Sequence, residues 1–251
     1  MKYRLILFLS LIILVILFWL TLPSKKVEVV FCDVGQGDAA LVIYKSWQMM
    51  IDVGPNNKKG LKCLENNLPF WDKKLEVVLL THGDSDHVGG LEDVSKFYKI
   101  EQMFSSENLN QYDVIKTDWI SFEVVNPAKK VEKGNDNNEN SVAGILTHSE
   151  SSGQGWSIFM SGDITADVER RLVWQKILTE EVDVLKVSHH GSKDGTTDEL
   201  LEILKPKMAV ISVGVKNKYG HPTKEVLDRL TKKGIEILRT DLEGDIIVNS
   251  F

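Results

Sequence analysis

Two histidines and two aspartates lie within six residues of this chain, directly after a short apolar segment. The run 81–90 reads THGDSDHVGG and follows the apolar residues 77–80. Buried carboxylates are costly unless they are paired or bind a cation, and core packing gives no reason for this combination. The spacing H-x-D-x-D-H directs nitrogen and oxygen ligands of one turn toward neighbouring points, and such ligands suit zinc, manganese or iron. The run therefore predicts a metal site that can serve two cations.

Two further motifs follow other apolar segments. Ser161-Gly162-Asp163 comes after residues 156–160, where Asp163 could bridge two cations, and the adjacent imidazoles of His189 and His190 come after residues 184–187. Alone, a Gly-Asp pair is usually a turn and a histidine pair is often a surface feature. In succession after strands they favour a binuclear site, because ligands of α/β proteins bind at the carboxyl ends of strands. Only His148 stands outside these motifs and the Gly220-His221-Pro222 turn.

The order of apolar segments and turns predicts an α/β fold. A β-rich first half is followed by units that alternate strand and helix, which is typical of layered sheets flanked by helices. The polar stretch 129–140 is expected to be an exposed loop. Strands are expected at 27–32, 39–44, 48–53, 77–81, 156–160, 184–187, 208–213, 236–239 and 245–249, and helices at 91–98, 165–178, 197–204 and 223–233.

The first 26 residues differ in composition from the rest. Residues 5–22 carry no charge and are flanked by basic residues at positions 2, 4, 25 and 26. A helix of this length just reaches across a hydrocarbon core of ~30 Å. Trp19 suits a membrane interface, and the run does not end in the small residues of a cleavage site. We expect 1–26 to be a single-pass anchor in the cell membrane, with the domain 27–251 on the extracytoplasmic side.

The charge of the domain bears on its substrate. The whole chain has a net charge of −6, whereas residues 27–251 retain 26 basic and 36 acidic residues, a net charge of −10. This acidity is unfavourable for nucleic-acid binding, which depends on lysine and arginine contacts to phosphates. Metal ions add positive charge that the residue count omits. A basic rim near the site is expected from Lys186, Lys193, Lys216 and Lys218.

The two cysteines, Cys32 and Cys63, do not lie in a C-x-x-C motif, so a structural zinc ribbon or a thioredoxin-like site is not supported. Cys32 lies in an expected apolar strand and is predicted to be a buried thiol. A disulfide between the two cysteines is the open alternative.

With these motifs the sequence resembles the metallo-β-lactamase superfamily and, within it, the carboxy-terminal hydrolase domain of the ComEC family of DNA-uptake competence proteins. The resemblance covers nearly all of 27–251 and implies a four-layer αβ/βα sandwich. Here that domain is expected to be preceded by one transmembrane helix in place of the family's many-helix channel. The matching segments are FCDVGQGD at 31–38, IDVG at 51–54, residues 81–90, SGD at 161–163, residues 183–192, YGHP at 219–222 and RTD at 239–241.

The resemblance implies a role for each matching residue, with two divalent metal ions, zinc or manganese, as cofactors. One metal would be held by His82, Asp84 and Asp163, and the other by Asp86, His87, Asp163 and His190. His190 is assigned as the ligand and His189 as substrate-facing by similarity to phosphorylcholine esterases. The candidate catalytic residues are Asp86, which would position the attacking water, and His189 and His221, which would bind a phosphate oxygen or protonate the leaving group.

Four more residues are implied as supporting or substrate contacts. Asp52 would not bind the metal itself but would hold the metal-binding loop in place through contacts with the metal ligands. Asn140 and Ser141 stand where many superfamily members place another metal-binding histidine, which implies an open coordination position or a polar phosphate contact. Ser192 ends the histidine-pair motif.

The expected function is that of a membrane-anchored phosphodiesterase, most simply a nuclease that cleaves DNA in a competence-related setting. Single-stranded DNA is a candidate substrate, and a separate membrane channel is a candidate partner. One alternative is hydrolysis of an envelope phosphodiester such as a decorated teichoic acid. Another is a metal-holding module of a DNA-uptake assembly without turnover. Hydrolysis of β-lactams or thioesters is less favoured, because Asp84 stands where those relatives usually carry histidine. The native metal and the oligomeric state stay open.

Overall fold

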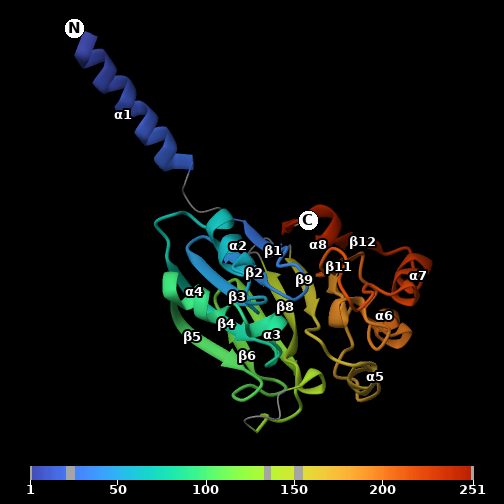
Figure 1. The fold of residues 1–251 in the computed structure, drawn as a ribbon. Helices are drawn as coiled ribbons and strands as arrows, with labels where there is room; N and C mark the ends of the chain where they lie inside the picture. Colours follow the sequence, from blue (N-terminus) through green and yellow to red (C-terminus); the bar gives the residue numbers. More distant parts are fainter. Residues whose placement is uncertain (1, 21–25, 133–136, 150–154, 250–251) are drawn as a thin grey trace.

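The structure, a computed structural model, describes residues 2–20, 26–132, 137–149 and 155–249. Two β-sheets face each other, and helices cover the outer face of each sheet (Figure 1). The first sheet has six strands, in the order β13 (Ile246–Asn249), β1 (Val27–Phe31), β2 (Ala40–Tyr44), β3 (Trp47–Ile51), β4 (Lys74–Leu80) and β5 (Lys99–Ser105). The second sheet has seven, in the order β12 (Glu236–Arg239), β11 (Met208–Ile211), β10 (Val184–Lys186), β9 (Gly155–Met160), β8 (Ala143–Ser149), β7 (Ile120–Asn126) and β6 (Val114–Lys116).

Three apolar layers hold these elements together. The middle layer lies between the sheets and is formed by inward residues such as Val42 of β2 and Ile158 of β9. The alternate residues of the same strands point outward, because successive side chains of a strand face opposite ways. They pack against the helices, as Met50 does with Leu64. The result is the helix-sheet-sheet-helix sandwich that the sequence predicts, and its α/β class is confirmed.

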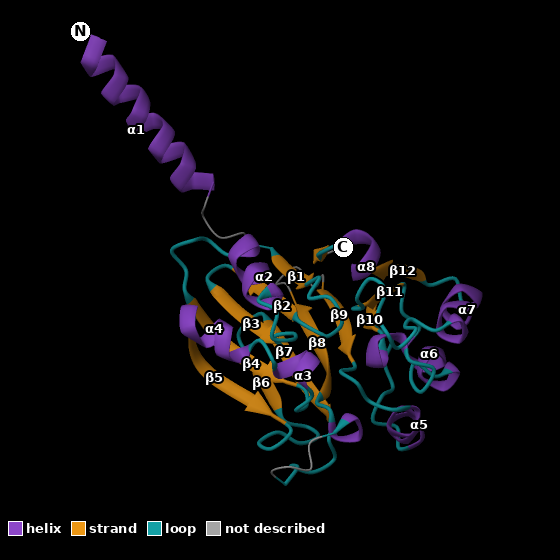
Figure 2. Ribbon diagram, viewed as in Figure 1, coloured by secondary structure: helices purple, strands orange, loops and turns teal. Residues whose placement is uncertain are grey.

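Helices are drawn in purple in Figure 2. The first sheet is covered by α2 (Lys59–Asn67) and α4 (Leu91–Phe97), and the second by α5 (Ala166–Trp174), α6 (Asp198–Leu204) and α7 (Lys224–Lys232). Shorter turns of helix are α3 (Ser85–Val88), α8 (Thr240–Glu243), η1 (Asn138–Asn140) and η2 (Ser188–Gly191).

The register explains why polar motifs end up together. Strands β3, β4 and β5 are parallel, and so are β9, β10, β11 and β12. Parallel strands bring their carboxyl ends to one edge of a sheet, so the segments that follow β3, β4, β9 and β10 meet there.

Several elements lie where the apolar pattern of the sequence predicts no regular structure. They are strands β5 to β8 and helix α2. Most of β5 is exposed, and β6 has only three residues, so neither carries an apolar alternation. The expected loop 129–140 contains η1 at its end, and its residues 133–136 lie outside the described ones.

Helix α1 (Lys2–Leu20) covers most of the segment in which a membrane anchor is expected. Across the ranges that the structure describes, no helix is both long enough and apolar enough to cross a membrane. The expected transmembrane helix is therefore not found among these residues, and positions 21–25 of the expected anchor are not among those described.

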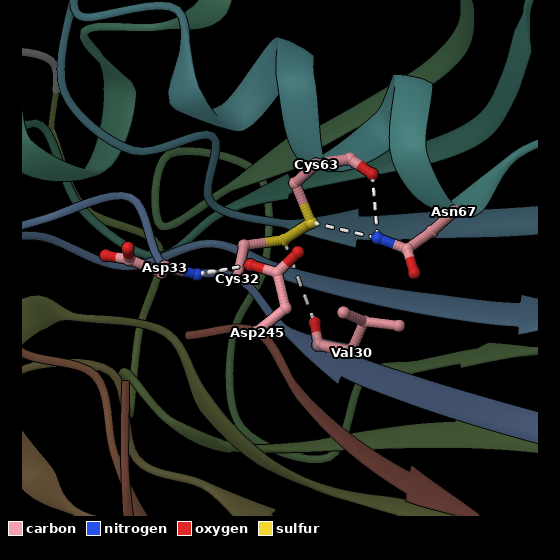
Figure 3. Close-up of a disulfide and its surroundings, with 6 residues drawn as sticks. All are labelled: Val30, Cys32, Asp33, Cys63, Asn67 and Asp245. Carbon is pink, nitrogen blue, oxygen red and sulfur yellow. Dashed lines mark hydrogen bonds between the residues drawn. A yellow bond between two sulfur atoms is a disulfide. The ribbon is translucent and has the colours of Figure 1, made fainter. Parts of the chain in front are cut away.

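A disulfide joins Cys32, just after β1, to Cys63 in α2 (Figure 3). The Cα atoms are 5.9 Å apart, and both side chains are buried. The Asn67 amide donates to the Cys63 carbonyl at 2.8 Å, which fixes this part of α2. The prediction of a buried free thiol at Cys32 is therefore wrong. An apolar strand position fits a half-cystine as well as a thiol, and the partner is 31 residues away, so only the packing of α2 onto the sheet reveals the pair.

Candidate metal centre

Five segments from both sheets converge at one edge of the sandwich. Asp52 follows β3, the run 81–90 follows β4, Asp163 follows β9, and His189 and His190 follow β10. The fifth segment is the loop between β1 and β2, which contains Asp38.

Four buried side chains form the centre of this cluster: Asp38, His87, Asp163 and His190. One nitrogen or oxygen atom from each lies within 4.8 Å of the corresponding atoms of the others. Nε2 of His87 is 3.3 Å from Oδ2 of Asp163, and Nε2 of His190 is 3.4 Å from the same oxygen. Asp163 therefore stands between the two imidazoles.

The far nitrogen of each imidazole is held from behind. Nδ1 of His87 is 2.8 Å from Oδ2 of Asp52, and Nδ1 of His190 is 3.0 Å from the carbonyl oxygen of Ser212. In the neutral form of each ring, the contact makes Nδ1 the protonated nitrogen and leaves the lone pair on Nε2, which points into the cluster.

Several buried polar atoms of the site have no hydrogen-bond partner among the described residues. They include Nε2 of His82, His87 and His190, Oδ1 of Asp163 and Nδ1 of His221. Orphaned buried polar atoms are costly and rare in folded proteins. A set of imidazole nitrogens and carboxylate oxygens that face one another without partners fits a divalent cation such as zinc or manganese. The residues present therefore fit a metal site.

Asp52 fastens the metal loop to β3. Its Oδ1 accepts the Thr81 backbone N–H at 2.8 Å, and its Oδ2 accepts the Thr81 hydroxyl at 2.7 Å as well as facing His87. These contacts hold the start and the end of the H-x-D-x-D-H turn on one buried carboxylate. Asp52 itself has a φ of 57°, which turns the chain sharply after the strand.

The remaining residues of the H-x-D-x-D-H run lie around the central four. Nε2 of His82 is 3.5 Å from Oδ2 of Asp84, and Nε2 of His190 is 3.4 Å from Oδ2 of Asp86. The rings of His82 and His87 are 4.1 Å apart. Asp84 is the outermost member, with 58% of its side chain exposed. The structure thus gathers all six residues that the sequence assigns as ligands.

His189 and His221 line the open side of the centre. Their ring centres are 5.9 Å apart, and Nε2 of His189 is 3.8 Å from Oδ2 of Asp163. His189 is about a third exposed, whereas His190 is buried. Burial lowers the pKa of both His189 and His221, so both rings are neutral at pH 7 and can accept or donate a hydrogen bond.

Ser141 contacts the centre directly. Its Oγ accepts the Asp163 backbone N–H at 3.1 Å and lies 3.5 Å from Nδ1 of His82. A Cβ atom on Gly162 would lie 2.3 Å from this oxygen, so only glycine allows the approach. Asn140 lies in η1, and the buried hydroxyl of Ser192 accepts the Asp194 backbone N–H at 3.3 Å.

The charges of the centre are strongly coupled. Burial opposes protonation of His87, but the carboxylates of Asp163 and Asp52 raise its pKa well above the usual value. Burial likewise opposes ionisation of Asp163, but His190 and His87 hold its pKa well below the usual value. The pocket thus concentrates negative charge and attracts protons or metal cations.

Asp38 and Lys186 are part of the site, whereas the sequence predicts only a basic rim that includes Lys186 and gives Asp38 no role. The Lys186 ammonium pairs with the Asp38 carboxylate and lies 3.8 Å from Oδ1 of Asp163. Lys186 is 3% exposed, so the expectation that it belongs to an exposed basic rim is wrong. Gly37 allows this arrangement, because a Cβ atom there would lie 2.1 Å from the Asp86 carbonyl oxygen. The D-V-G-Q-G-D motif was a signal for Asp38, but its role depends on contacts between distant segments.

Glu169 also supports the site, and no sequence motif points to it. This buried residue of α5 accepts three hydrogen bonds: from the Ser188 hydroxyl at 2.6 Å and from the backbone N–H groups of Thr196 and Thr197, both at 2.7 Å. The bonds enclose the turn that carries His189 and His190, whose φ angles of 47° and 54° are unusual for non-glycine residues. Burial raises the pKa of Glu169. In the sequence, an acid on the apolar face of the expected helix was the signal that this carboxylate is buried and needs hydrogen-bond donors.

Comparison with known proteins gives consistent results. The model of the metallo-beta-lactamase superfamily matches residues 32–215. The chain is 30% identical to ComE operon protein 3 of Bacillus subtilis, over 89% of this chain and 33% of that protein. It is 28% identical to competence protein ComA of Neisseria gonorrhoeae, over 88% of this chain and 32% of that protein. The chain therefore spans about a third of the length of these relatives.

Among solved structures, the metallo-beta-lactamase fold protein YhfI of Bacillus subtilis matches with a TM-score of 0.57 and 11% sequence identity. The match covers 90% of this chain and all of that one, which shows a shared fold.

Proposed function

Because the chain belongs to the metallo-β-lactamase superfamily, we propose that residues 27–251 form a binuclear, metal-dependent phosphodiesterase that cleaves nucleic acid. The superfamily consists mainly of metal-dependent hydrolases, and this chain has a buried cluster of aspartate and histidine that suits a metal. The single observation that carries the proposal is the set of unpartnered Nε2 and carboxylate atoms that face one another around Asp163.

The residues of the centre fall into metal ligands and residues that orient those ligands. His82, Asp84 and Asp163 would hold one cation, and Asp86, His87, Asp163 and His190 would hold the other. When bound, the cations supply the positive charge that offsets the charge of a phosphodiester during in-line displacement. Asp52 and Ser141 keep the ligands oriented.

The open side of the centre provides the polar groups that a phosphodiester needs. Asp86 is the acceptor that orients the attacking water. His189 and His221 lie on the exposed side, where each neutral ring can donate one N–H to a non-bridging phosphate oxygen. Protonation of the leaving oxygen by either ring would require its imidazolium form, which the lowered pKa makes the minor form at pH 7.

The choice of DNA as substrate is supported by the relatives. The similar protein from Neisseria gonorrhoeae is named a competence protein, and its similarity extends over 88% of this chain. We therefore place the enzyme in a DNA-uptake setting, with single-stranded DNA as the substrate and a separate membrane channel as a partner.

The test is cleavage by the purified full chain, with manganese or zinc, of single-stranded DNA, a chromogenic phosphodiester and nitrocefin. Asp163→Asn removes the shared carboxylate charge and should lower DNA cleavage at least about a hundredfold, because the ligand is common to both cations. The matched control is Asp167→Asn, an acid on α5 that is 93% exposed and should leave activity unchanged.

Each outcome has a meaning. Full activity and full metal content in Asp163→Asn would refute the assignment of the centre. Cleavage of the chromogenic diester without cleavage of DNA would favour an envelope phosphodiester, such as a decorated teichoic acid. No cleavage of any substrate would favour a metal-holding module without turnover.

We also propose that residues 5–22 hold the domain at the outer face of the cell membrane. The support is the uncharged run between basic residues, and the Cys32–Cys63 disulfide, since disulfides persist in oxidising compartments. Cell fractionation, followed by protease treatment of intact cells, tests this. Recovery of the chain in the soluble fraction, or full protection from the protease, would refute it.

A further inference from the structure

A groove lies beside the metal centre, between the segment that follows β7 and helix α5. Its volume is about 460 Å³, and its charged lining residues are Lys129, Lys130, Glu132, Glu139 and Arg171. Asn140, which the sequence places near the centre, also lines it.

A second hollow adjoins the first at Lys130. It has a volume of about 450 Å³ and shares Lys130 with the groove. Its other charged residues are Asp113 and Lys116. We call the two hollows together the basic furrow. Because the two hollows meet at Lys130, together they cover more space than a single phosphate group requires.

The cations of the furrow are available for a ligand. In the part of the chain that the structure describes, none of Lys116, Lys129, Lys130 and Arg171 forms a salt bridge, whereas Lys96 and Lys205, for example, are paired with glutamates. The three lysines are exposed. The lining also has three acids, Asp113, Glu132 and Glu139, so the four cations leave the furrow with a net charge of +1 (4 − 3). The Asp113 carboxylate is engaged within its own turn, where Oδ2 accepts the Asn110 backbone N–H at 2.8 Å.

Arg171 is the most informative of these residues. It is half-buried, its guanidinium donates to Oδ1 of Asn126, and burial lowers its pKa. Asn126 is neutral, and no carboxylate of the described residues lies within salt-bridge distance of the guanidinium, although Glu132 and Glu139 line the same groove. A partly desolvated guanidinium beside an open groove is suited to a phosphate, which it can bind through two N–H donors.

A short chain of hydrogen bonds connects Arg171 to the metal centre. Asn126 is 1% exposed, and its Nδ2 donates to the Ser141 carbonyl at 2.7 Å. Ser141 in turn accepts the Asp163 backbone N–H through its Oγ at 3.1 Å. The furrow therefore lies close to the centre. At the surface, Nδ2 of Asn138 is 3.4 Å from Nδ1 of the partly exposed His189, and the two residues that follow, Glu139 and Asn140, line the furrow.

We propose that the basic furrow binds the phosphates of a nucleic-acid strand on one side of the cleaved bond, with Arg171 and Lys130 as binding residues. This inference rests on the proposed phosphodiesterase activity and extends it to the substrate class. It also answers the objection from charge: the domain is acidic as a whole, but a strand needs cations only along its path.

The test is binding of a fluorescently labelled oligothymidylate to the full chain, measured by anisotropy over a range of salt concentrations. The double variant Lys130→Gln and Arg171→Gln should bind about tenfold more weakly. The slope of log affinity against log salt should become shallower by roughly 1.4, since each phosphate contact on a single strand contributes about 0.7. The matched control, Lys232→Gln, removes an exposed lysine of α7 outside the furrow and should change neither value.

Replacing the half-buried Arg171 could disturb folding, so a second variant changes only an exposed residue. Lys130→Glu alone, at an exposed position, should also weaken binding by about tenfold, with an unchanged melting temperature. Unchanged oligonucleotide affinity in both variants would overturn the furrow. If the chain binds the strand through these residues but cleaves neither DNA nor the chromogenic diester, the proposed activity fails while the binding site stands. If it is an active enzyme, the double variant should lose at least about tenfold more on the strand than on the small diester, and equal losses would count against the furrow.

Discussion

The Cys32–Cys63 disulfide leads to the most quantitative prediction for this fold. It closes a loop of 31 residues that contains β2 and β3, and it ties α2 to the end of β1. In the chain-entropy account, a cross-link of this span removes about 3.7 kcal/mol of conformational freedom from the unfolded chain. That is a large share of the roughly 5 to 15 kcal/mol by which domains are usually stable.

The perturbation is reduction of the wild-type chain, which opens the loop without removing any side-chain atoms. With a dependence on urea of about 3 kcal/mol per molar, the loss should move the unfolding midpoint down by about 1 M. The double variant Cys32→Ala and Cys63→Ala should unfold at or below the midpoint of the reduced wild type, since it also loses buried sulfur atoms.

The assay is equilibrium urea unfolding followed by tryptophan fluorescence, with and without reductant. The double variant is the control, because reductant should not change its midpoint. Identical midpoints for oxidised and reduced wild type would refute the reasoning. So would alkylation of both cysteines in unreduced, denatured protein, since it would mean that no bond had formed.

Two further predictions concern the site. In Glu169→Gln, the amide NH2 replaces one carboxylate oxygen that accepts a hydrogen bond, so two donors face each other. This change should lower the free energy of unfolding by about 2 kcal/mol at pH 8. Because burial raises the folded-state pKa of Glu169, the native state binds a proton more tightly than the unfolded state. Wild type therefore loses stability as pH rises from the ordinary glutamate value through the raised one, and the variant should lack this loss when unfolding is measured between pH 4 and 8. Manganese or zinc at a hundredfold excess over its dissociation constant should stabilise the wild type by about 2.7 kcal/mol. That corresponds to a rise in melting temperature of roughly 5 to 10 °C. An equal rise in Asp163→Asn would argue against the centre.

The sequence was sufficient for the layered α/β fold and for the segments that form the centre. Apolar segments of strand length, each ended by polar residues, identified β4, β9 and β10, and the motifs after them lie together in the structure. The prediction succeeded for two reasons. Burial of one or both faces imposes a regular apolar pattern on a strand, and the carboxyl ends of parallel strands lie at one edge of the sheet. The same rule failed for β5 and β6, where the strands lie at sheet edges and need little apolar surface.

Only the tertiary structure decided which distant groups meet. The pairing of Lys186 with Asp38, the contacts of Glu169 around the histidine turn, and the Cys32–Cys63 bond each join segments that are separated by 19 or more residues. Lysine and glutamate are solvated in most proteins, so their identity favours the surface, and only the packing of two sheets and their helices places these two inside. Local sequence determines which side chains are available at each turn, whereas burial and charge balance depend on all the segments that pack around them.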